Sequence, residues 1–562
     1  MHVAEAVGQA LVTLGVRHVF GLLGSGNFVV TNALVEHGAQ FHASRHEGGA
    51  ITMADAYARV SGEVGVCTVH QGPGLTNTMT GLTEAAKSRT PLLLLAADTA
   101  ASAIRSNFRI EQDNLVRAVG AIPERLHGPA SAVADTVRAY RRAQAERRTV
   151  VLMLPLDVQA AESPRDGRFL PEPVQVQPSR PAEGVIQEAA DLLAGAQRPL
   201  IIAGRGAVLA EAREPLEHLA DILGALLATS ANGNGLFVGN PWSLGISGGF
   251  ASTAAAELIS QADVVLAVGA GLNMWTTRHG RLVSPDARVI QVDHEADLLG
   301  AHHRVDLAVL GDAGEAARAL VGELERRNFP LSRDRGRGPG GGGSPGWRTD
   351  AIRAQIVAGS WNATPFEDAS TDTQIDPRTL SIALDELLPE DRTLAVDSGH
   401  FMGYPPMYLR VPDARGFVFT QAYQAVGLGL ASAIGAAIAR PDRLTVAALG
   451  DGGAMMALPE LDTVARLGLH MLIVVYNDAA YGAEVHHFRP MGHPVELVQF
   501  PDVDFAALGR AAGLEGATVR TREDLSIVTA WLAGGGVPGL LLDAKVVPTI
   551  VAEWLEEAFR GH

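Results

Sequence analysis

Short apolar runs alternate with Ala-rich stretches of helical periodicity along most of this chain. The runs VGVCTVH and LTVAAL, for example, are followed by NTMTGLTEAAKS and PELDTVARLG. Even the most apolar runs, PLLLLAA from Pro91 and LIVVY from Leu472, are far shorter than the roughly 20 residues that a membrane-spanning helix needs. They are typical of strands buried on both faces of a parallel sheet. The pattern therefore predicts an α/β fold of doubly wound parallel sheets.

The first twenty residues follow the same pattern. In MHVAEAVGQALVTLGVRHVF, apolar positions at helical spacing predict an amphipathic helix that leads into a strand around Val19. Glu5 and Gln9 interrupt the apolar stretch, and no cationic segment precedes it. We therefore do not expect this segment to be a secretory signal.

Two breaks in the pattern divide the 562 residues into domain-sized blocks. Residues 162–184 are rich in Pro and charged residues, and residues 335–346 read RGRGPGGGGSPG. Such compositions are typical of linkers. We predict three domains, over residues 1–165, 185–330 and 373–562, with residues 331–372 as a linker.

Composition and charge narrow the possible functions. A mean hydropathy of +0.13 excludes a disordered chain. The formal net charge of −17 argues against a nucleic-acid partner, because phosphate binding needs a basic surface. A single cysteine, Cys67, excludes a disulfide framework and a zinc site built from cysteines. We expect a cytoplasmic protein that acts on a small molecule and has no nucleic-acid or membrane partner.

The segment LTVAALGDGGAMMALPELDTVARLGLHMLIVVYNDAAYG carries the clearest candidate chemistry. One predicted strand runs into Gly450-Asp451-Gly452-Gly453, and the next ends near Asp478. Ligands of open parallel sheets bind at the carboxyl ends of strands, where both acids are placed. The glycines let the backbone approach a phosphate, and the carboxylates are hard oxygen ligands for Mg²⁺. A GDGG turn alone is common, so the second acidic strand end is what favours this interpretation.

This pattern closely resembles the GDG…N signature of thiamine-diphosphate-dependent enzymes. The resemblance implies a cofactor-binding role for Gly450, Gly452 and Gly453, and a Mg²⁺ site made by Asp451, Asp478 and the backbone carbonyl of Ala480. Asp478 stands where many members have Asn, and Asp is also a competent ligand.

The amino-terminal block resembles the same family. In FHASRHEGGAITMADAYARVSGEVGVCTVHQGPGLTN, Glu47 precedes a predicted helix, and His70 and Gln71 follow a predicted strand. An acid at a helix start is common on its own. In thiamine-diphosphate enzymes, a Glu at this place hydrogen-bonds the aminopyrimidine ring and promotes the imino tautomer that removes the thiazolium C2 proton. The resemblance thus implies catalytic roles for Glu47, His70 and Gln71.

The resemblance covers nearly the whole chain and is closest to acetolactate synthases and benzoylformate decarboxylases. It implies pyrimidine-binding, central and diphosphate-binding domains, in that order. Val426 matches the bulky apolar residue that bends the cofactor, with a plain core residue as the alternative. His70 and Ser25 match residues of the decarboxylases, with a hydrogen-bonded structural His and a simple turn as the alternatives. Asn27, in the same loop as Ser25, is a tentative substrate contact.

Three further positions bear on the substrate. Arg109 lies at or near the position of a pocket Gln in acetolactate synthases, and Glu484 and His487 replace apolar and Trp residues of their substrate pocket. Exposed loop charges are the alternative. As pocket residues, they would make a more polar site than one built for two pyruvate molecules, so simple acetolactate formation is not the expected reaction.

The central block offers weaker signals. Gly204-Arg205-Gly206 follows one predicted strand, and Asp293 ends another. Acetolactate synthases hold FAD in this domain, whereas other members hold a nucleotide or nothing. FAD is therefore a possible cofactor that the residues do not decide, because a fold does not determine its ligand.

Together these features predict an enzyme dependent on thiamine diphosphate and Mg²⁺ that decarboxylates or ligates a 2-oxo acid. The resemblance implies at least a homodimer, and a homotetramer is expected. A lyase for 2-hydroxyacyl thioesters is an alternative, although we find no basic cluster in the sequence for a coenzyme A phosphate. A cofactor-binding protein without catalysis would not require Glu47. A dinucleotide oxidoreductase lacks its G-x-G-x-x-G motif, since GSGNFVV and GRGAVLA both lack the third glycine.

Overall fold

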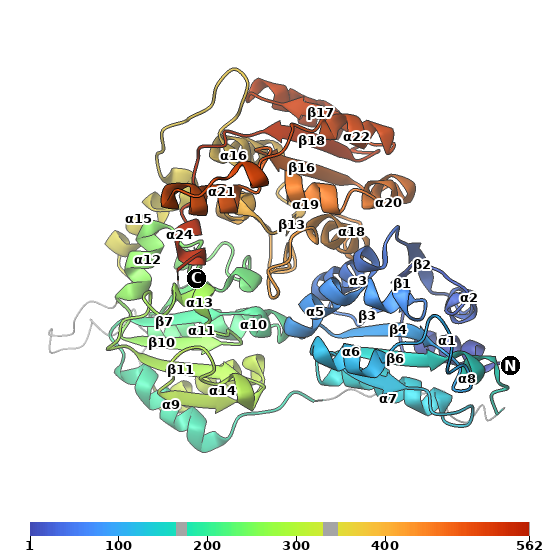
Figure 1. The fold of residues 1–562 in the computed structure, drawn as a ribbon. Helices are drawn as coiled ribbons and strands as arrows, with labels where there is room; N and C mark the ends of the chain where they lie inside the picture. The colour runs from blue at the N-terminus through green and yellow to red at the C-terminus, as the bar shows by residue number, and fades with distance from the viewer. Residues whose placement is uncertain (165–176, 330–346, 561–562) are drawn as a thin grey trace.

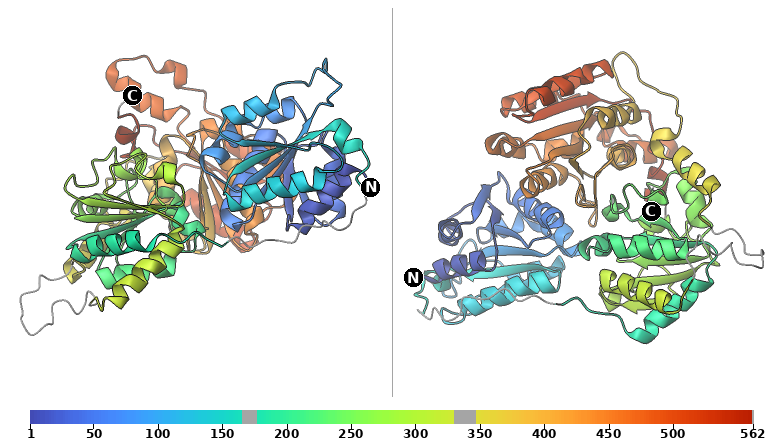
Figure 2. Two further views of the ribbon diagram at one scale, coloured as in Figure 1. Left: turned by 90° about the horizontal axis from the view of Figure 1, so that it is seen from below. Right: turned by 180° about the vertical axis from the view of Figure 1, so that it is seen from behind.

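The structure, a computed structural model, describes residues 1–164, 177–329 and 347–560. Three six-stranded sheets follow one another along the chain, and all of their pairings are parallel. Figure 1 shows the three sheets as separate lobes, each with helices on both faces, and Figure 2 shows the same division from two other sides. The predicted doubly wound α/β fold is confirmed.

The amino-terminal domain has the strand order 2-1-3-4-6-5. The strands, in spatial order, are β2 (Gln40–Ala43), β1 (His18–Gly21), β3 (Gly65–Val69), β4 (Leu92–Asp98), β6 (Thr149–Pro155) and β5 (Ile122–Arg125). The helices are α1 (Val3–Thr13), α2 (Phe28–Glu36), α3 (Glu47–Ser61), α4 (Pro73–Thr76), α5 (Met79–Lys87), α6 (Gln112–Ala118), α7 (Ala132–Ala145) and α8 (Leu156–Ala160). The expected first helix and the strand around Val19 are both present.

The central domain repeats the architecture with its own core. Its strands, in spatial order, are β12 (Leu307–Leu310), β11 (Arg288–Asp293), β10 (Val264–Val268), β7 (Pro199–Ala203), β8 (Leu226–Thr229) and β9 (Ser243–Ile246). Its helices are α9 (Glu183–Gly195), α10 (Arg205–Leu209), α11 (Arg213–Leu223), α12 (Thr253–Ser260), α13 (Met274–Thr277) and α14 (Ala313–Arg326).

The carboxyl-terminal domain holds the third sheet. Its strands, in spatial order, are β14 (Phe417–Phe419), β13 (Arg392–Val396), β15 (Leu444–Gly450), β16 (Met471–Asn477), β18 (Leu540–Lys545) and β17 (Glu515–Val519). The main helices around it are α16 (Pro377–Leu387), α17 (Tyr404–Tyr408), α18 (Gly429–Ala439), α19 (Asp451–Met456), α20 (Glu460–Leu467), α21 (Gly482–Phe488), α22 (Phe505–Ala511), α23 (Ser526–Ala533) and α24 (Leu555–Ala558).

Helices α3 and α18 join the first and third domains. A Cβ atom on Gly435 of α18 would lie 2.1 Å from the carbonyl oxygen of Met53 in α3, so the two helices touch through their backbones. One buried apolar cluster runs through this contact and includes residues of both sheets. The two domains therefore share a core, and their relative position is fixed by close packing.

The predicted linker contains ordered structure in its second half. Helix α15 (Asp350–Ala358) packs against α12, and the indole of Trp361 donates a hydrogen bond to the Phe250 carbonyl at 2.9 Å. The whole glycine-rich stretch 335–346, and residues 165–176 of the earlier break, lie outside the described residues. Among the residues that the structure does describe, no helix combines the length and apolar character needed to cross a bilayer.

Candidate functional site

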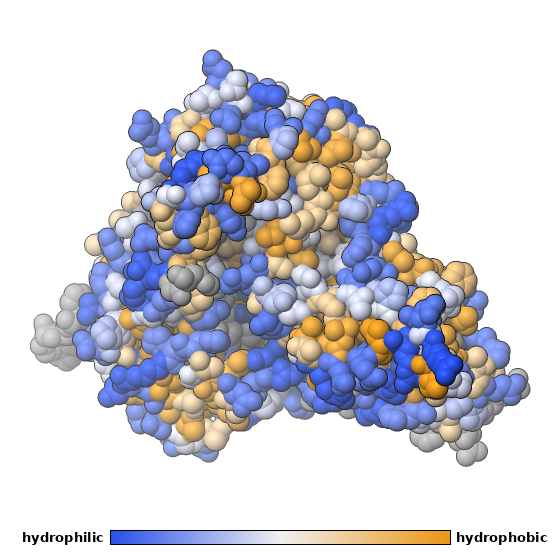
Figure 3. All heavy atoms as spheres, viewed as in Figure 1, coloured by the Kyte–Doolittle hydropathy of each residue, from blue (hydrophilic) through white to orange (hydrophobic). Residues whose placement is uncertain are grey.

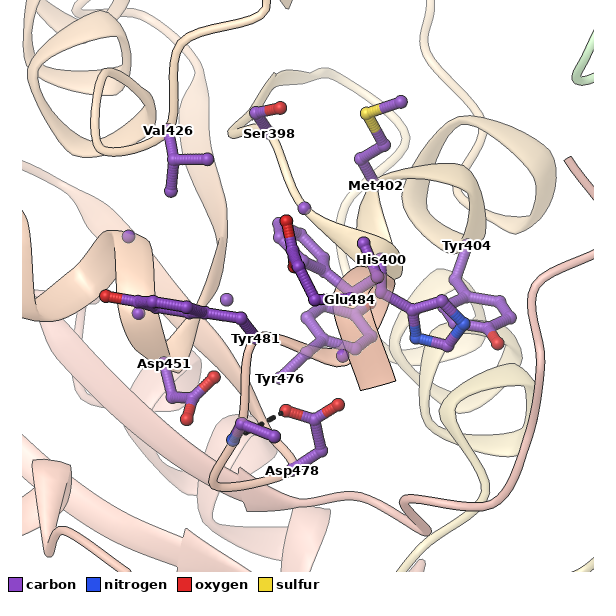
Figure 4. Close-up of a pocket in the computed structure, with 18 of the residues that line it drawn as sticks. Ser398, His400, Met402, Tyr404, Val426, Asp451, Tyr476, Asp478, Tyr481 and Glu484 are labelled. Carbon is purple, nitrogen blue, oxygen red and sulfur yellow. Dashed lines mark hydrogen bonds between the residues drawn. The ribbon is translucent and has the colours of Figure 1, made fainter. Parts of the chain in front are cut away.

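A pocket of about 380 Å³ opens at the carboxyl ends of β13, β15 and β16. This is where open parallel sheets bind ligands, because strand ends and helix starts meet there. Figure 4 shows Asp451 and Asp478 on one side of the pocket and Val426 and Ser398 on the other. The central domain contributes Trp275, and the segment near the carboxyl terminus contributes Trp554. Among the described residues, none from the amino-terminal domain lines this pocket.

Asp451, which is buried, and Asp478, which is half-buried, form an acidic pair in this pocket. Asp451 begins α19, and Asp478 directly follows β16. Burial, and for Asp451 also the nearby charge of Asp478, raises the pKa of Asp451 to about 7 and that of Asp478 to about 6. Two such carboxylates oppose each other's ionisation unless a cation lies beside them. The pair therefore fits a divalent cation that takes one or two carboxylates and completes its shell with other oxygens.

The remaining predicted metal ligand lies in the same turn. The Ala480 N–H donates to the Asp478 carboxylate at 3.3 Å, and the preceding Ala479 has φ +55, a left-handed conformation. Within the described residues, no group of three or more His, Cys, Asp and Glu side chains is arranged to hold a metal. A site of two carboxylates and a backbone carbonyl would leave positions for phosphate oxygens, as Mg²⁺ prefers.

The predicted glycine turn is closely packed. A Cβ on Gly453 would lie 2.2 Å from Asp397 Oδ2, and one on Gly452 would lie 2.6 Å from the Tyr481 ring. Gly450, which ends β15, also lines the pocket. Side chains at Gly452 and Gly453 would collide with these neighbours, so the turn packs closely only with glycine, and the cofactor role of the three glycines stays a prediction.

The loop that carries Val426 is held by a residue that sequence reasoning missed. Asp397, after β13, accepts hydrogen bonds from the N–H groups of Gly427 at 3.0 Å and Leu428 at 3.2 Å. Val426 itself lines the pocket and is 39% exposed, so it is not a plain core residue. The sequence feature that could have identified Asp397 is an acidic residue directly after a predicted strand, which is also the feature that identified Asp451.

The far wall of the pocket is polar, as expected from Glu484, but it differs from the prediction in detail. Glu484 lines the pocket, whereas His487 stacks on Phe559 with ring centroids 3.8 Å apart. His400, which was not predicted, also lines the pocket. Its Nε2 accepts from the Ala552 N–H at 2.9 Å, and burial lowers its pKa to about 3, so it is a neutral ring.

Two pocket side chains have buried polar atoms without a partner in the structure. These atoms are Oε1 and Nε2 of Gln421 and the indole Nε1 of Trp554, among the described residues. Buried polar groups in proteins are normally hydrogen-bonded, so these atoms are available to a bound molecule. The described lining residues that carry a formal charge are Asp451, Asp478 and Glu484, all acidic.

Glu47 begins α3 in the amino-terminal domain and is 8% exposed. Its carboxylate accepts a hydrogen bond from Asn77 Nδ2 at 2.9 Å. The backbone just before it, at Arg45 and His46, donates to Glu460 of the third domain. Glu47 is thus next to its own chain's third domain, but it does not line the pocket that holds Asp451.

His70, Gln71 and Ser25 lie together, away from that pocket. Ser25 Oγ and His70 Nε2 are 3.3 Å apart, and the other ring nitrogen of His70 is 2.9 Å from the Gln71 carbonyl oxygen. Gln71 is buried, and its Oε1 lacks a partner. The structure thus brings together residues that are 45 positions apart in the chain.

Asn27 and Arg109 have different surroundings. Asn27 is fully buried, and its side chain bonds to the Gly24 N–H and to Thr68 Oγ1, so it shapes the Ser25 loop. Its predicted contact with substrate does not fit this burial. Arg109 is exposed, next to Phe108, whose ring packs against His70 at 4.9 Å.

The chain belongs to the thiamine-diphosphate-dependent enzyme family. Residues 1–116 match the N-terminal TPP binding domain of thiamine pyrophosphate enzymes, residues 186–320 match their central domain, and residues 397–540 match their C-terminal TPP binding domain. The resemblance inferred from the GDGG and RHE motifs is thereby confirmed.

Relatives at the sequence level cover nearly the whole chain. A sulfoacetaldehyde acetyltransferase of Castellaniella defragrans is 30% identical over 93% of this chain and 89% of its own length. An acetolactate synthase large subunit of Parasynechococcus marenigrum is 29% identical over 92% and 84%. The solved thiamine diphosphate-dependent 4-hydroxybenzoylformate decarboxylase of Rhodococcus jostii RHA1 shares the fold, with a TM-score of 0.82 at 21% identity over 98% of this chain and all of that one.

Proposed function

We propose that this enzyme uses thiamine diphosphate and Mg²⁺ to remove carbon dioxide from a 2-oxo acid and to pass the remaining acyl group to a proton or to a second carbonyl compound. The observation that carries the proposal is the pair of Asp451, which is buried, and Asp478, which is half-buried, beside a turn of three glycines. Two carboxyl groups in a pocket whose described lining has no cationic side chain suit a metal ion, and the glycine turn suits a diphosphate.

The chain's residues have separable tasks in this proposal. Asp451, Asp478 and the Ala480 carbonyl hold the metal, and Val426 supports the cofactor from the loop that Asp397 fixes. When bound, thiamine diphosphate supplies the nucleophilic carbon and the electron sink. Glu47 would hold and exchange the proton whose transfer activates the bound cofactor.

His70 and Ser25 are placed to exchange protons with the substrate, because their side chains lie together on the same surface. Gln71 is close to this pair and stays a predicted catalytic residue, and it is buried beneath the Ser25 loop. A Cβ on Gly26 would lie 1.8 Å from Gln71 Oε1.

A second chain completes the site in this proposal. Glu47 does not line its own chain's metal pocket, so we propose that it serves the pocket of a partner in a homodimer, which in turn forms a homotetramer. Apolar side chains are unusually exposed near both halves of the site. Val426 and Met456 are 39% and 56% exposed near the pocket, and Ile104 and Phe108 are 69% and 42% exposed in the amino-terminal domain. Figure 3 shows apolar residues gathered over parts of both domains.

We propose that the second substrate is a carbonyl compound other than pyruvate. We also propose that the enzyme is cytoplasmic. Glu484 and the neutral His400 make the pocket wall polar, and the buried amide of Gln421 is free to bond a hydroxyl or carbonyl group. A second substrate with a negative charge would need a cationic side chain to bind it. The described pocket lining has none, so we propose Arg109 of the partner subunit for this role.

A substrate screen tests the reaction class. The enzyme is reconstituted with thiamine diphosphate and Mg²⁺ and given 2-oxo acids, alone and with aldehyde acceptors. Released carbon dioxide and mass spectra of the products are the readout. We expect turnover of a 2-oxo acid, with little acetolactate from pyruvate alone because the pocket wall is polar. Rapid acetolactate formation would contradict the substrate proposal, and no turnover of any 2-oxo acid would contradict the reaction class.

A further inference from the structure

A second cavity, of about 170 Å³, lies between the first two domains. The carboxyl ends of β7, β10, β11 and β12 form one side, and the ends of helices α5 and α7 reach it from the amino-terminal domain. Three arginines and one carboxylate line it: Arg89 and Arg147 from the first domain, and Arg205 and Asp293 from the central domain. They are far apart in the chain, so this basic cluster is invisible in the sequence.

This cavity does not fit the flavin dinucleotide that related synthases hold in their central domain. The Gly204 and Gly206 N–H groups donate to the carbonyls of Val268 and Gly269 at 2.9 and 3.0 Å, so they are not free for a diphosphate. A Cβ on Gly204 would lie 2.2 Å from the Gly269 oxygen. These glycines let the turns after β7 and β10 pack closely. The volume of the cavity is also below the roughly 300 Å³ of a typical small-molecule site.

Arg205 is a buried cation that forms no direct ion pair among the described side chains, and the nearby carboxylates of Asp55 and Glu84 both pair with Arg59. Its guanidinium donates to the Ser88 carbonyl and to Thr90 Oγ1, which are neutral groups. Burial, and then the nearby charge of Arg59, lowers the pKa of Arg205 to about 9. A buried charge is normally paired directly, so this guanidinium, which lines the cavity, is suited to a bound anion.

Arg89 and Arg147 keep much of their hydrogen-bonding capacity. Their ion pairs are long, 3.6 Å from Arg89 to Glu295 and 3.7 Å from Arg147 to Asp312. Both residues have φ near +50, a left-handed conformation that favours Gly or Asn. At each of these two positions, a long cationic side chain is attached to a backbone conformation that disfavours residues with a side chain.

We propose that this cavity binds a small oxyanion of the inorganic phosphate class, held by Arg89, Arg147 and Arg205. Guanidinium groups recognise phosphate oxygens through charge-assisted hydrogen bonds, and the volume suits one such ion. The cavity shares Arg147 and His294 with a wider open groove, so a longer phosphate-bearing molecule is the competing occupant.

A buried polar network connects this cavity to the cofactor pocket. Thr90, which accepts from Arg205, donates to Asp55 at 2.5 Å, and Asp55 pairs with Arg59 at 2.7 Å. Arg59 then donates to Glu84 at 2.9 Å.

Glu84 completes the connection by accepting the Tyr423 N–H at 2.7 Å. Tyr423 belongs to the loop that carries Val426. An oxyanion beside Arg205 would weaken the repulsion between that cation and Arg59, so we expect it to stabilise the network and the loop together. This coupling rests on the proposed function, whereas oxyanion binding does not.

Isothermal titration calorimetry with inorganic phosphate tests the site. The protein is saturated with thiamine diphosphate and Mg²⁺, so that phosphate cannot occupy the diphosphate site. We expect binding at one site per chain. Arg147→Gln should weaken it by about tenfold or more, because a charge-assisted hydrogen bond contributes roughly 1.5–3 kcal/mol. Arg142→Gln is the matched control, because Arg142 pairs with Glu124 at 3.1 Å and does not line the cavity.

Several results would overturn the proposed site. They are the absence of phosphate binding at millimolar concentration, equal weakening by both variants, and tighter binding of ADP than of phosphate. A purified protein with the absorbance of bound flavin would overturn it as well. If thiamine diphosphate itself fails to bind, the proposed function fails, but the comparison of the two variants with phosphate still decides this site.

The coupling has its own test. We expect phosphate to tighten thiamine diphosphate binding severalfold in the wild type, and thiamine diphosphate to tighten phosphate binding by the same factor. Glu84→Gln should reduce this factor while phosphate still binds, because Glu84 does not line the cavity. Equal cofactor affinity with and without phosphate would overturn the coupling.

Discussion

At the scale of single residues, the site depends on buried acids that are held in different ways. Asp451 and Asp478 face each other without a cation, and burial raises both pKa values. Asp397 is fully buried, which raises its pKa to about 6 as well, but backbone N–H groups donate hydrogen bonds to its carboxylate. The first two acids are therefore suited to a metal, whereas Asp397 is suited to holding a loop.

We predict that Asp397→Ala weakens thiamine diphosphate binding by about tenfold. The change leaves the N–H groups of Gly427 and Leu428 without their acceptor, at a cost of roughly 1–3 kcal/mol, and it frees the Val426 loop. Titration calorimetry measures the affinity. Asp442→Ala is the control, because Asp442 forms an exposed pair with Arg440 that contributes little. Unchanged affinity in Asp397→Ala would show that the loop does not need this acid.

We predict that Glu47→Gln lowers turnover by at least about 100-fold, because general acid–base groups contribute roughly 10²–10⁴. Cofactor affinity and thermal stability should change little, since Gln is the same size and can still bond Asn77. Steady-state kinetics with the substrate found in the screen give the result. The exposed Glu36→Gln is a matched control. Turnover within about threefold of wild type would exclude the proposed role.

At the scale of elements, the fold depends on close contact between helices from different domains. Helices α3 and α18 approach so closely that Gly435 has no room for a side chain. Helix α3 also carries Glu47 at its start and the buried Asp55 and Arg59 along its length. A single helix thus links the proposed proton-exchanging residue to the network under the Val426 loop.

We predict that Gly435→Ala lowers the free energy of unfolding by about 1–3 kcal/mol, because the new methyl group would overlap the Met53 backbone. Gly322→Ala in α14 is the control, since an added Cβ there meets nothing within 4 Å. Removing a helical glycine at such a site should stabilise slightly. Urea unfolding of both variants measures the difference, and an unchanged midpoint in Gly435→Ala would contradict close helix contact.

At the scale of the whole molecule, the structure separates the two halves of the proposed site within one chain. Glu47 lies in the first domain, and the pocket with Asp451 is lined by the second and third domains. The exposed apolar residues near both halves suit burial against another copy. A symmetric dimer would bring two complete and equivalent sites together.

Mixed dimers test this arrangement. Homodimers of Glu47→Ala and of Asp451→Ala should both be inactive. When the chains are co-expressed, about half of the dimers should carry one chain of each kind, and one of their two sites should have neither change. We predict activity of about a quarter of the wild type if the sites act independently. Verified mixed dimers as inactive as their parents would contradict a shared site.

The sequence by itself determined the family, the class of fold and the acidic pair in the pocket of the third domain. Strand–helix alternation can be recognised from short stretches of sequence. Asp451 and Asp478 can be found in the same way, because each directly follows a strand at the same sheet edge. Glu47 could be found for a similar reason, since it begins a helix within a recognisable motif. Such signals survive in the sequence because the residues that make them are neighbours in the chain or end neighbouring strands.

The tertiary structure alone decided which distant residues meet. It showed that Asn27 is buried, that His487 packs on Phe559, and that His400 faces the pocket instead. It also assembled Arg89, Arg147 and Arg205 around one cavity, although the sequence shows no basic cluster. Burial and charge proximity depend on how whole domains pack against each other, and periodicity along the chain carries no record of that packing.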